Sequence, residues 1–170
     1  IKEIFQENTK KIAKLFDKEA KIKNKSCEYG PSTDTYFIDK DLTLFIENYC
    51  SKGSFNKQVP SFAYAAPSEF ITGLLRGYFD GDGNVQCDKN HHYLRACSRS
   101  ERLIKDLGIL YSYKGIFVNY QIEKDKLGSD LYHYIIPYKY AETYIKNIGS
   151  DDPMKLAPLN DLVDYINRSD

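Results

Sequence analysis

Apolar side chains recur at helical spacing in several stretches of the chain. Residues 1–19 and 41–49 each place their apolar positions on one face, and Asp41 is a candidate cap for the second helix. The most regular pattern covers residues 68–80, directly after Pro67. Three more helices are predicted: one that Ser100 caps and Gly115 ends, one over 138–147, and one near 158–167.

Other stretches alternate between polar and apolar residues, as half-buried strands do. Residues 84–90 and 116–124 alternate in this way, and return strands are expected at 92–98 and 131–136. Two shorter strands, 21–28 and 34–39, flank a turn signal at Tyr29-Gly30-Pro31-Ser32. Residues 68–149 therefore read αββαββα and residues 1–50 read αββα, which predicts an α+β chain of one and a half repeats.

Composition narrows the class of protein. The chain has 170 residues, 42% of them apolar and 14% aromatic, which excludes a disordered chain. No apolar run approaches the ~20 residues that a membrane span needs. The four cysteines show no CxxC pairing, so we expect reduced thiols in an intracellular protein rather than a zinc site. The N-terminus has neither a signal peptide nor an initiator Met, which suggests a piece of a longer chain.

Charge argues at first against a nucleic-acid partner, because 24 basic residues balance 24 acidic ones. The distribution is uneven, however. Seven lysines fall between Lys10 and Lys25, further basic residues follow along 89–126, and the last 20 residues hold five acids against two basic residues. The average of zero hides a polarised molecule, and DNA is not excluded.

Two carboxylates follow the regular helix in Asp80-Gly81-Asp82-Gly83. A helix C-terminus disfavours negative charge, and a hard cation such as Mg2+ or Ca2+ would compensate it through oxygen ligands. A plain turn is one alternative. A calcium loop of the EF-hand type is another, but Val85 and His91 stand where Gly and Glu are required. Within the helix, Gly73 and Gly77 lie four apart on one face, which indicates close helix–helix approach.

Residues 75–83, Leu-Arg-Gly-Tyr-Phe-Asp-Gly-Asp-Gly, resemble the LAGLIDADG motif of homing endonucleases. The flanks extend the resemblance over nearly the whole chain: Lys57-Gln58-Val59-Pro60, Ser98-Arg99-Ser100, residues 110–116 and Asp152-Pro153-Met154-Lys155. The first of these is similar to a segment of intein-encoded members. Single-chain members carry two motifs and this chain has one. Residues 1–66 then resemble a partial first repeat without its motif helix, and 67–170 a full second repeat whose motif helix is 68–80.

The resemblance implies an αββαββα fold with a saddle-shaped, antiparallel or mixed sheet that lies on double-stranded DNA. It implies a site-specific endonuclease that cuts both DNA strands in intein homing, with Mg2+ or another divalent cation. Asp82 and the carbonyl of Gly81 would bind the metal, and Asp80 would be a helix-end acid. Lys57 and Lys155 would act near the reacting phosphate. Gly73 and Gly77 would pack against a second LAGLIDADG helix, from a missing N-terminal part or from another chain.

The open strand faces would read DNA bases in the major groove. The residues expected to do so are Asn84, Gln86, Asp88, Asn90, Tyr93, Arg95, Asn119, Gln121 and Glu123. Arg99, Arg102 and the Lys10–Lys25 cluster would hold phosphates. No splicing residues are visible, since the chain has no N-terminal Cys or Ser and no C-terminal His-Asn. The alternative is a non-catalytic DNA-binding or structural module with the same scaffold.

Overall fold

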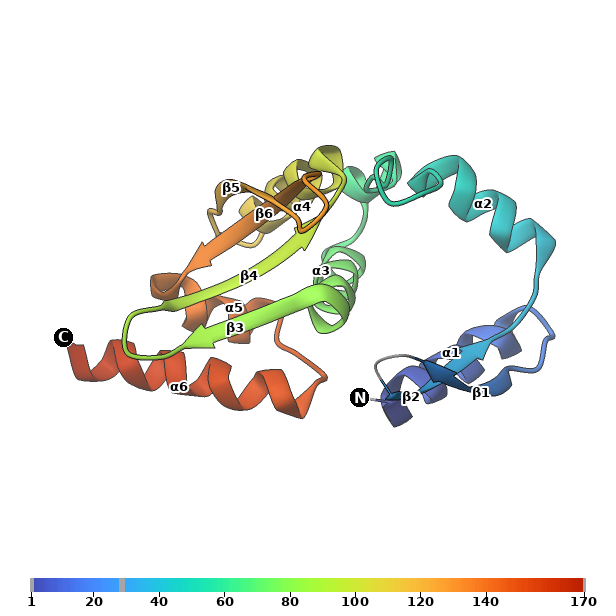
Figure 1. Cartoon of the computed structure of the whole chain (residues 1–170), viewed down its shortest axis with the longest axis horizontal. Coiled ribbons are helices and arrows are strands. Elements are labelled where there is room, and N and C mark those ends of the chain that lie inside the picture. Colours follow the sequence, from blue (N-terminus) through green and yellow to red (C-terminus); the bar gives the residue numbers. More distant parts are fainter. Residues whose placement is uncertain (1, 28–29, 170) are drawn as a thin grey trace. The chain divides into compact units, whose positions relative to one another are not determined.

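The computed structural model describes residues 2–27 and 30–169, which form two compact units (Figure 1). The first unit extends to Asn48 and the second begins at Tyr49. Residues 49–66 thus pack with the second unit. The division of the chain into repeats at residues 66 and 67 remains a prediction.

The first unit has the predicted αββα order: α1 (Lys2–Leu15), β1 (Lys21–Cys27), β2 (Gly30–Tyr36) and α2 (Lys40–Cys50), whose last turn reaches the second unit. The two strands are antiparallel and pair Cys27 directly with Gly30. Gly30, Pro31 and Ser32 therefore belong to the strand and not to the predicted turn, whose remaining residue, Tyr29, lies outside the described residues.

The cap of α2 also differs from the prediction. The backbone N–H of Leu42 donates to Oδ1 of Asp39 at 2.8 Å, so Asp39 caps the helix in place of Asp41. The physical reason is that α2 begins at Lys40, which puts Asp39 immediately before its first turn.

The second unit contains the predicted αββαββα order with one further helix. A short 3₁₀ turn, η1 (Ser61–Ala65), precedes the long helix α3 (Ser68–Asp82) and the hairpin of β3 (Gly83–Cys87) and β4 (His92–Ser98). Next come α4 (Glu101–Ser112) and the hairpin of β5 (Asn119–Lys124) and β6 (Asp130–Pro137). The chain ends with η2 (Tyr138–Tyr140), α5 (Ala141–Asn147) and α6 (Pro153–Ser169). The four strands form an antiparallel sheet in the order β3-β4-β6-β5.

One face of this sheet is packed and the other is open. Leu94, Ala96, Tyr134 and Ile136 point to the packed face and are at most 2% exposed. Helices α3 and α4 contact the sheet on that side, and α6 runs beside β3 (Figure 1). Apolar side chains from these elements form one core: Leu75, Phe79, Leu94, Leu107, Tyr111, Tyr134, Ile136, Tyr144, Leu159 and Leu162. Within the described part of the second unit, no helix covers the opposite face.

Several element boundaries differ from the sequence prediction, among them the starts of β5 and α5, and two of the differences concern predicted site residues or their neighbours. Strand β3 ends at Cys87, so Asp88 and Asn90 lie in the hairpin turn, where Oδ1 of Asp88 accepts from the backbone N–H of Asn90 at 2.9 Å. Helix α6 begins at Pro153, five residues earlier than expected. Asp152 is 2% exposed and accepts from the backbone N–H of Met154 at 3.0 Å, which makes it the helix cap and Pro153 the first helical residue.

Ser100 and Gly115 act as predicted at the two ends of α4. The hydroxyl of Ser100 accepts from the backbone N–H of Leu103 at 3.2 Å, and Gly115 has a positive φ of 76°. Cys50, Cys87 and Cys97 carry free thiols. Over the described residues, every helix is too short or too polar to cross a membrane.

Candidate functional site

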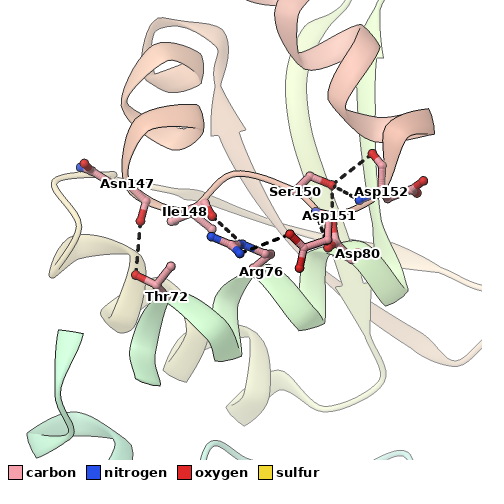
Figure 2. Close-up of polar contacts among 8 residues, drawn as sticks. All are labelled: Thr72, Arg76, Asp80, Asn147, Ile148, Ser150, Asp151 and Asp152. Atoms are coloured by element: carbon pink, nitrogen blue, oxygen red, sulfur yellow. Dashed lines mark hydrogen bonds and ion pairs between the residues drawn. The ribbon is translucent and has the colours of Figure 1, made fainter. Parts of the chain in front are cut away.

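Helix α3 extends through Asp82, and the two aspartates in its last turn lie in opposite environments. Asp80 belongs to the buried stripe of the helix and is 7% exposed. Its carboxylate accepts from the hydroxyl of Ser150 at 2.5 Å and from the backbone N–H of Asp151 at 3.0 Å (Figure 2). Asp80 therefore holds the loop between α5 and α6 against the motif helix.

The same stripe of α3 makes further contacts with this loop. Thr72 and Arg76 precede Asp80 by two turns and one turn, so all three side chains point the same way. The hydroxyl of Thr72 donates to the carbonyl of Asn147 at 3.3 Å, and Nε of Arg76 donates to the carbonyl of Ile148 at 2.7 Å (Figure 2). The stripe fixes the path of the chain into α6.

Lys155, in the first turn of α6, reaches the C-terminal end of α3. Its ammonium group donates to the carbonyl of Phe79 at 2.6 Å and to that of Asp80 at 2.7 Å. Burial lowers the pKa of Lys155, and the nearby acids Asp152, Asp80 and Asp82 oppose that effect. The cation satisfies helix-end carbonyls and lies at the negative end of the helix dipole.

Asp82, by contrast, is exposed, and in the described part of the chain its side chain makes no hydrogen bond or ion pair. The sheet register pairs Gly83 with Ala96, which brings Asp82 beside Cys97. Burial raises the pKa of the Cys97 thiol, and the charge of Asp82 adds to this shift. Asp82 is thus an unused carboxylate at the junction of the motif helix and the open sheet.

Gly83 explains how the chain turns so sharply after Asp82. A Cβ at this position would lie 2.2 Å from the ring of Phe79 and 2.5 Å from its carbonyl oxygen. Phe79 is fully buried, so neither group can yield easily. At Gly81, a Cβ would meet nothing within 4 Å among the described residues. Packing therefore requires glycine at position 83 and does not require it at position 81.

Lys57 lies at the other side of this junction. Its carbonyl accepts from the hydroxyl of Ser100 at 2.5 Å, just beyond the end of β4 that also approaches Asp82. Its side chain is exposed. The structure thus brings Lys155 directly to the end of the motif helix and Lys57 to the neighbouring end of the sheet.

The oxygen atoms at the end of α3 fit a hard cation that is bound partly by the protein and partly by its substrate. Within the described residues no group of three or more His, Cys, Asp or Glu side chains could hold a metal ion. Asp82 and the carbonyl of Gly81 could offer such a cation one or two oxygen ligands. Mg2+ commonly binds through one or two carboxylates and completes its shell with water and substrate phosphates.

Most of the predicted base-reading residues share the open sheet face. Asn84 lies opposite Arg95, Gln86 opposite Tyr93, and the β5 residues Asn119, Gln121 and Glu123 follow on the far side of β6. Several of them pair with one another: Nδ2 of Asn84 donates to Oε1 of Gln86 at 3.0 Å, and Nε2 of Gln121 donates to Oε1 of Glu123 at 3.1 Å.

Other predicted DNA contacts lie elsewhere. Asp88 and Asn90 are in the β3–β4 turn. Arg99 follows β4 and forms an ion pair with Asp125 at 2.5 Å. Arg102 lies on α4, the helix that packs against the other face of the sheet, and faces Asp106 at 3.8 Å. His133 of β6 is not among the residues predicted from sequence; it points to the open face yet is 4% exposed. His133 lies between two bulky tyrosines in the sequence, so no alternation of polar and apolar residues assigns it to one face of the strand.

Gly73 and Gly77 are exposed on α3, and a Cβ at either would meet nothing within 4 Å in the described chain. The close helix contact predicted from their spacing is therefore not made among these residues. An open groove of about 700 Å³ lies beside Gly73, lined by Arg76, Lys114 and Lys146 among others.

Comparisons with known proteins agree with this geometry. Residues 69–149 match the LAGLIDADG-like domain family. The chain is 32% identical over 139 residues to the DNA-directed RNA polymerase subunit Rpo1C of Methanocaldococcus jannaschii, covering 82% of this chain and 15% of that protein. It is 27% identical over 128 residues to a DNA polymerase of Thermococcus kodakarensis, covering 62% of this chain and 8% of the relative. The chain thus spans less than a fifth of these relatives.

Solved structures show the same fold. The homing endonuclease I-DmoI in complex with DNA and Mn matches with a TM-score of 0.61 at 12% identity, over 86% of this chain and 73% of that chain. The homing endonuclease I-WcaI bound to its DNA recognition sequence matches with a TM-score of 0.51 at 17% identity, over 91% and 71%. At such low identity the likeness establishes the fold.

Proposed function

Because residues 69–149 are a LAGLIDADG-like domain with the fold of homing endonucleases, we propose that the chain is a site-specific DNA endonuclease that cuts duplex DNA with a divalent cation. The observation that carries the proposal is Asp82. It is the acid of the motif that the fold leaves exposed and without a hydrogen bond or ion pair in the described chain, whereas Asp80 is committed to the fold.

Asp82 and the carbonyl of Gly81 would hold the cation at the scissile phosphate. When bound, such a cation activates water and stabilises the leaving oxygen of a phosphodiester. Lys57 would place positive charge near the reacting phosphate. Lys155 acts mainly through the helix: its two hydrogen bonds fix the last turn of α3 and thereby the position of Asp82.

The open sheet face would lie in the major groove. Its amides, Arg95 and Glu123 offer the hydrogen-bonding groups that distinguish base pairs there. Arg99, Arg102 and the Lys10–Lys25 cluster would contact phosphates, which position the protein on the duplex.

A second motif helix would complete the site. The exposed Gly73 and Gly77 leave α3 free for close approach of another helix, and the groove beside Gly73 has room for its side chains. One chain provides one Asp82 and hence one metal-binding acid, which serves one strand of the DNA duplex. The partner helix would come from another chain or from a further part of the protein.

An inserted, intein-type element would explain the pattern of relatives. The matching segment occupies 15% of an RNA polymerase subunit, 8% of a DNA polymerase and, in Methanocaldococcus jannaschii, 11% of a probable translation initiation factor IF-2. These three proteins have unrelated functions, and a segment shared by them is what insertion into different hosts would produce.

The experiment is a two-step selection. Purified chain, at concentrations high enough for two α3 helices to pair, is mixed with a randomised duplex pool in Ca2+, and bound duplexes are recovered and then given Mg2+. We expect strand breaks at a fixed position in the bound sequences. Asp82→Asn should bind the same sequences and leave them intact.

A non-catalytic DNA-binding module is the second candidate, and the single motif of the chain favours it. It predicts sequence-specific binding with no breaks in Mg2+ or Mn2+. That result would overturn the endonuclease proposal, and failure to bind any duplex would overturn both.

A further inference from the structure

The middle of the open sheet face carries a cluster of three side chains from three adjacent strands. Nη1 of Arg95, on β4, lies 3.8 Å from Oε1 of Glu123, on β5, so the two side chains reach toward each other across β6. Oε2 of Glu123 lies 3.4 Å from Nε2 of His133, on β6. The charged pair is half-exposed, with 35% of the Arg95 side chain and 42% of the Glu123 side chain accessible.

His133 is unusual for a residue on an open face. It is 4% exposed, and among the described residues neither of its ring nitrogens has a hydrogen-bond partner. Buried polar atoms without partners are rare and call for an explanation. Burial lowers the pKa of His133; Glu123 opposes this shift and Arg95 adds to it, and the net effect favours the neutral ring in the free protein. Its two ring nitrogens are therefore available to form hydrogen bonds beside the Glu123 carboxylate.

The Arg95–Glu123 pair is itself loosely held. A separation of 3.8 Å exceeds hydrogen-bond length, and half-exposed ion pairs of this kind are weak. A base pair that offers better partners to both groups can therefore exchange with it. Loss of Arg95 from the pair would leave the carboxylate with Gln121, which donates to Oε1 at 3.1 Å, and with Oε2 facing His133, whose unpartnered nitrogen can then hold it in place.

The chemistry of the two groups selects the base pair. Arginine has donors only and matches the two adjacent acceptors N7 and O6 of guanine. An ionised glutamate has acceptors only, and it matches the N4 amino group of cytosine. In the major groove only G·C presents two adjacent acceptors on one base and a donor on the other. Phosphates and thymine O4 would repel Glu123.

We propose that Arg95 and Glu123 together read one G·C pair in the target DNA, with Arg95 on guanine, Glu123 on cytosine, and His133 as the positioning residue for Glu123. This inference rests on the proposed DNA-binding function. It goes further by assigning one base pair to three named side chains.

The experiment compares base preferences of the native chain and variants, obtained by selection from a randomised duplex pool. The native chain should show one position with strong G·C preference, about 5- to 150-fold over other pairs, the range of a good bidentate contact. Glu123→Gln keeps the shape of the side chain but adds a donor that thymine O4 can accept. Because Arg95 still favours guanine, the G·C preference at that position should weaken without moving to another base pair.

Two further variants test the other members at the same position. Arg95→Lys keeps the charge but loses the planar fork, so the guanine preference should weaken there while affinity for other sequences persists. His133→Leu removes both ring nitrogens and should weaken discrimination at that position and at no other. The matched control is Glu101→Gln, the same charge change on α4 in a residue paired with Lys105 at 2.7 Å; its profile should equal the native one.

The outcomes separate this inference from the proposed function. A native chain that selects a specific sequence, with a profile that Glu123→Gln and Arg95→Lys leave unchanged, overturns the inference and leaves DNA recognition standing. A native chain that selects no duplex at all overturns both.

Discussion

Replacing each acid of the motif by its amide should have opposite consequences for stability and for cleavage. Asp80→Asn changes a carboxylate that is 7% exposed and accepts from Ser150 at 2.5 Å and from the backbone N–H of Asp151 at 3.0 Å. Asparagine can still accept from the backbone N–H of Asp151, and the Ser150 hydroxyl can turn to accept from its NH2 group, but both hydrogen bonds lose their charged acceptor. Since a hydrogen bond to a charged group contributes about 1.5–3 kcal/mol, we expect a loss of that size.

Asp82→Asn removes a charge that is exposed and makes no hydrogen bond or ion pair in the described chain. A carboxylate at a helix C-terminus is unfavourable by about 0.3–1 kcal/mol. The substitution should therefore leave the free energy of unfolding unchanged or raise it by up to that amount, while it abolishes metal-dependent cleavage.

The assay is urea unfolding, followed by far-UV circular dichroism and by the fluorescence of the 15 tyrosines, since the chain has no tryptophan. For a unit of this size the expected loss in Asp80→Asn corresponds to a melting point roughly 6–12 °C lower. Two results would contradict these roles of the two acids: destabilisation by Asp82→Asn as large as that by Asp80→Asn, or an Asp80→Asn variant as stable as the native chain.

Three further substitutions test the packing around the motif helix. Gly83→Ala should destabilise the protein and reduce cleavage because its Cβ would lie 2.2 Å from the ring of Phe79, whereas Gly81→Ala, with open space around it, should be tolerated in urea unfolding. Gly77→Ala should stabilise the isolated chain by about 1 kcal/mol, yet weaken self-association in analytical ultracentrifugation, because it fills the exposed face of α3; unchanged self-association would contradict a role in helix pairing. Lys155→Met should cost about 1.5–3 kcal/mol in the same unfolding assay through the lost hydrogen bonds to the end of α3, while the exposed Lys146→Met should have little effect.

Local patterns in the sequence predicted most of the fold. The αββαββα order, the cap at Ser100, the stop at Gly115 and the sidedness of β5 all depend on near neighbours in the chain, and the structure confirms each. The errors arose where two local signals competed. The last helix is expected only near 158–167, although a capping acid followed by proline also starts a helix, and Asp152-Pro153 does so in α6.

The candidate site depended more on contacts between distant residues. Asp80 and Asp82 are two positions apart and look alike in sequence, and only the packing of the loop after α5 shows that Asp80 is committed to the fold. Lys155 reaches carbonyls 75 and 76 residues earlier in the chain, a contact that no local pattern encodes. His133 lies between two tyrosines, so its burial beneath Glu123 depends on the register of three strands.

The proposed role of Asp82, to hold a divalent cation for DNA cleavage, can be measured as a rate of strand breakage. The rate of strand breakage in Mg2+ is compared between the native chain and Asp82→Asn on a selected duplex at equal DNA occupancy. We expect breaks by the native chain and a fall in rate with Asp82→Asn that exceeds the roughly 10–100-fold cost of losing an outer-shell partner of a metal. Equal cleavage by the two proteins would contradict this role.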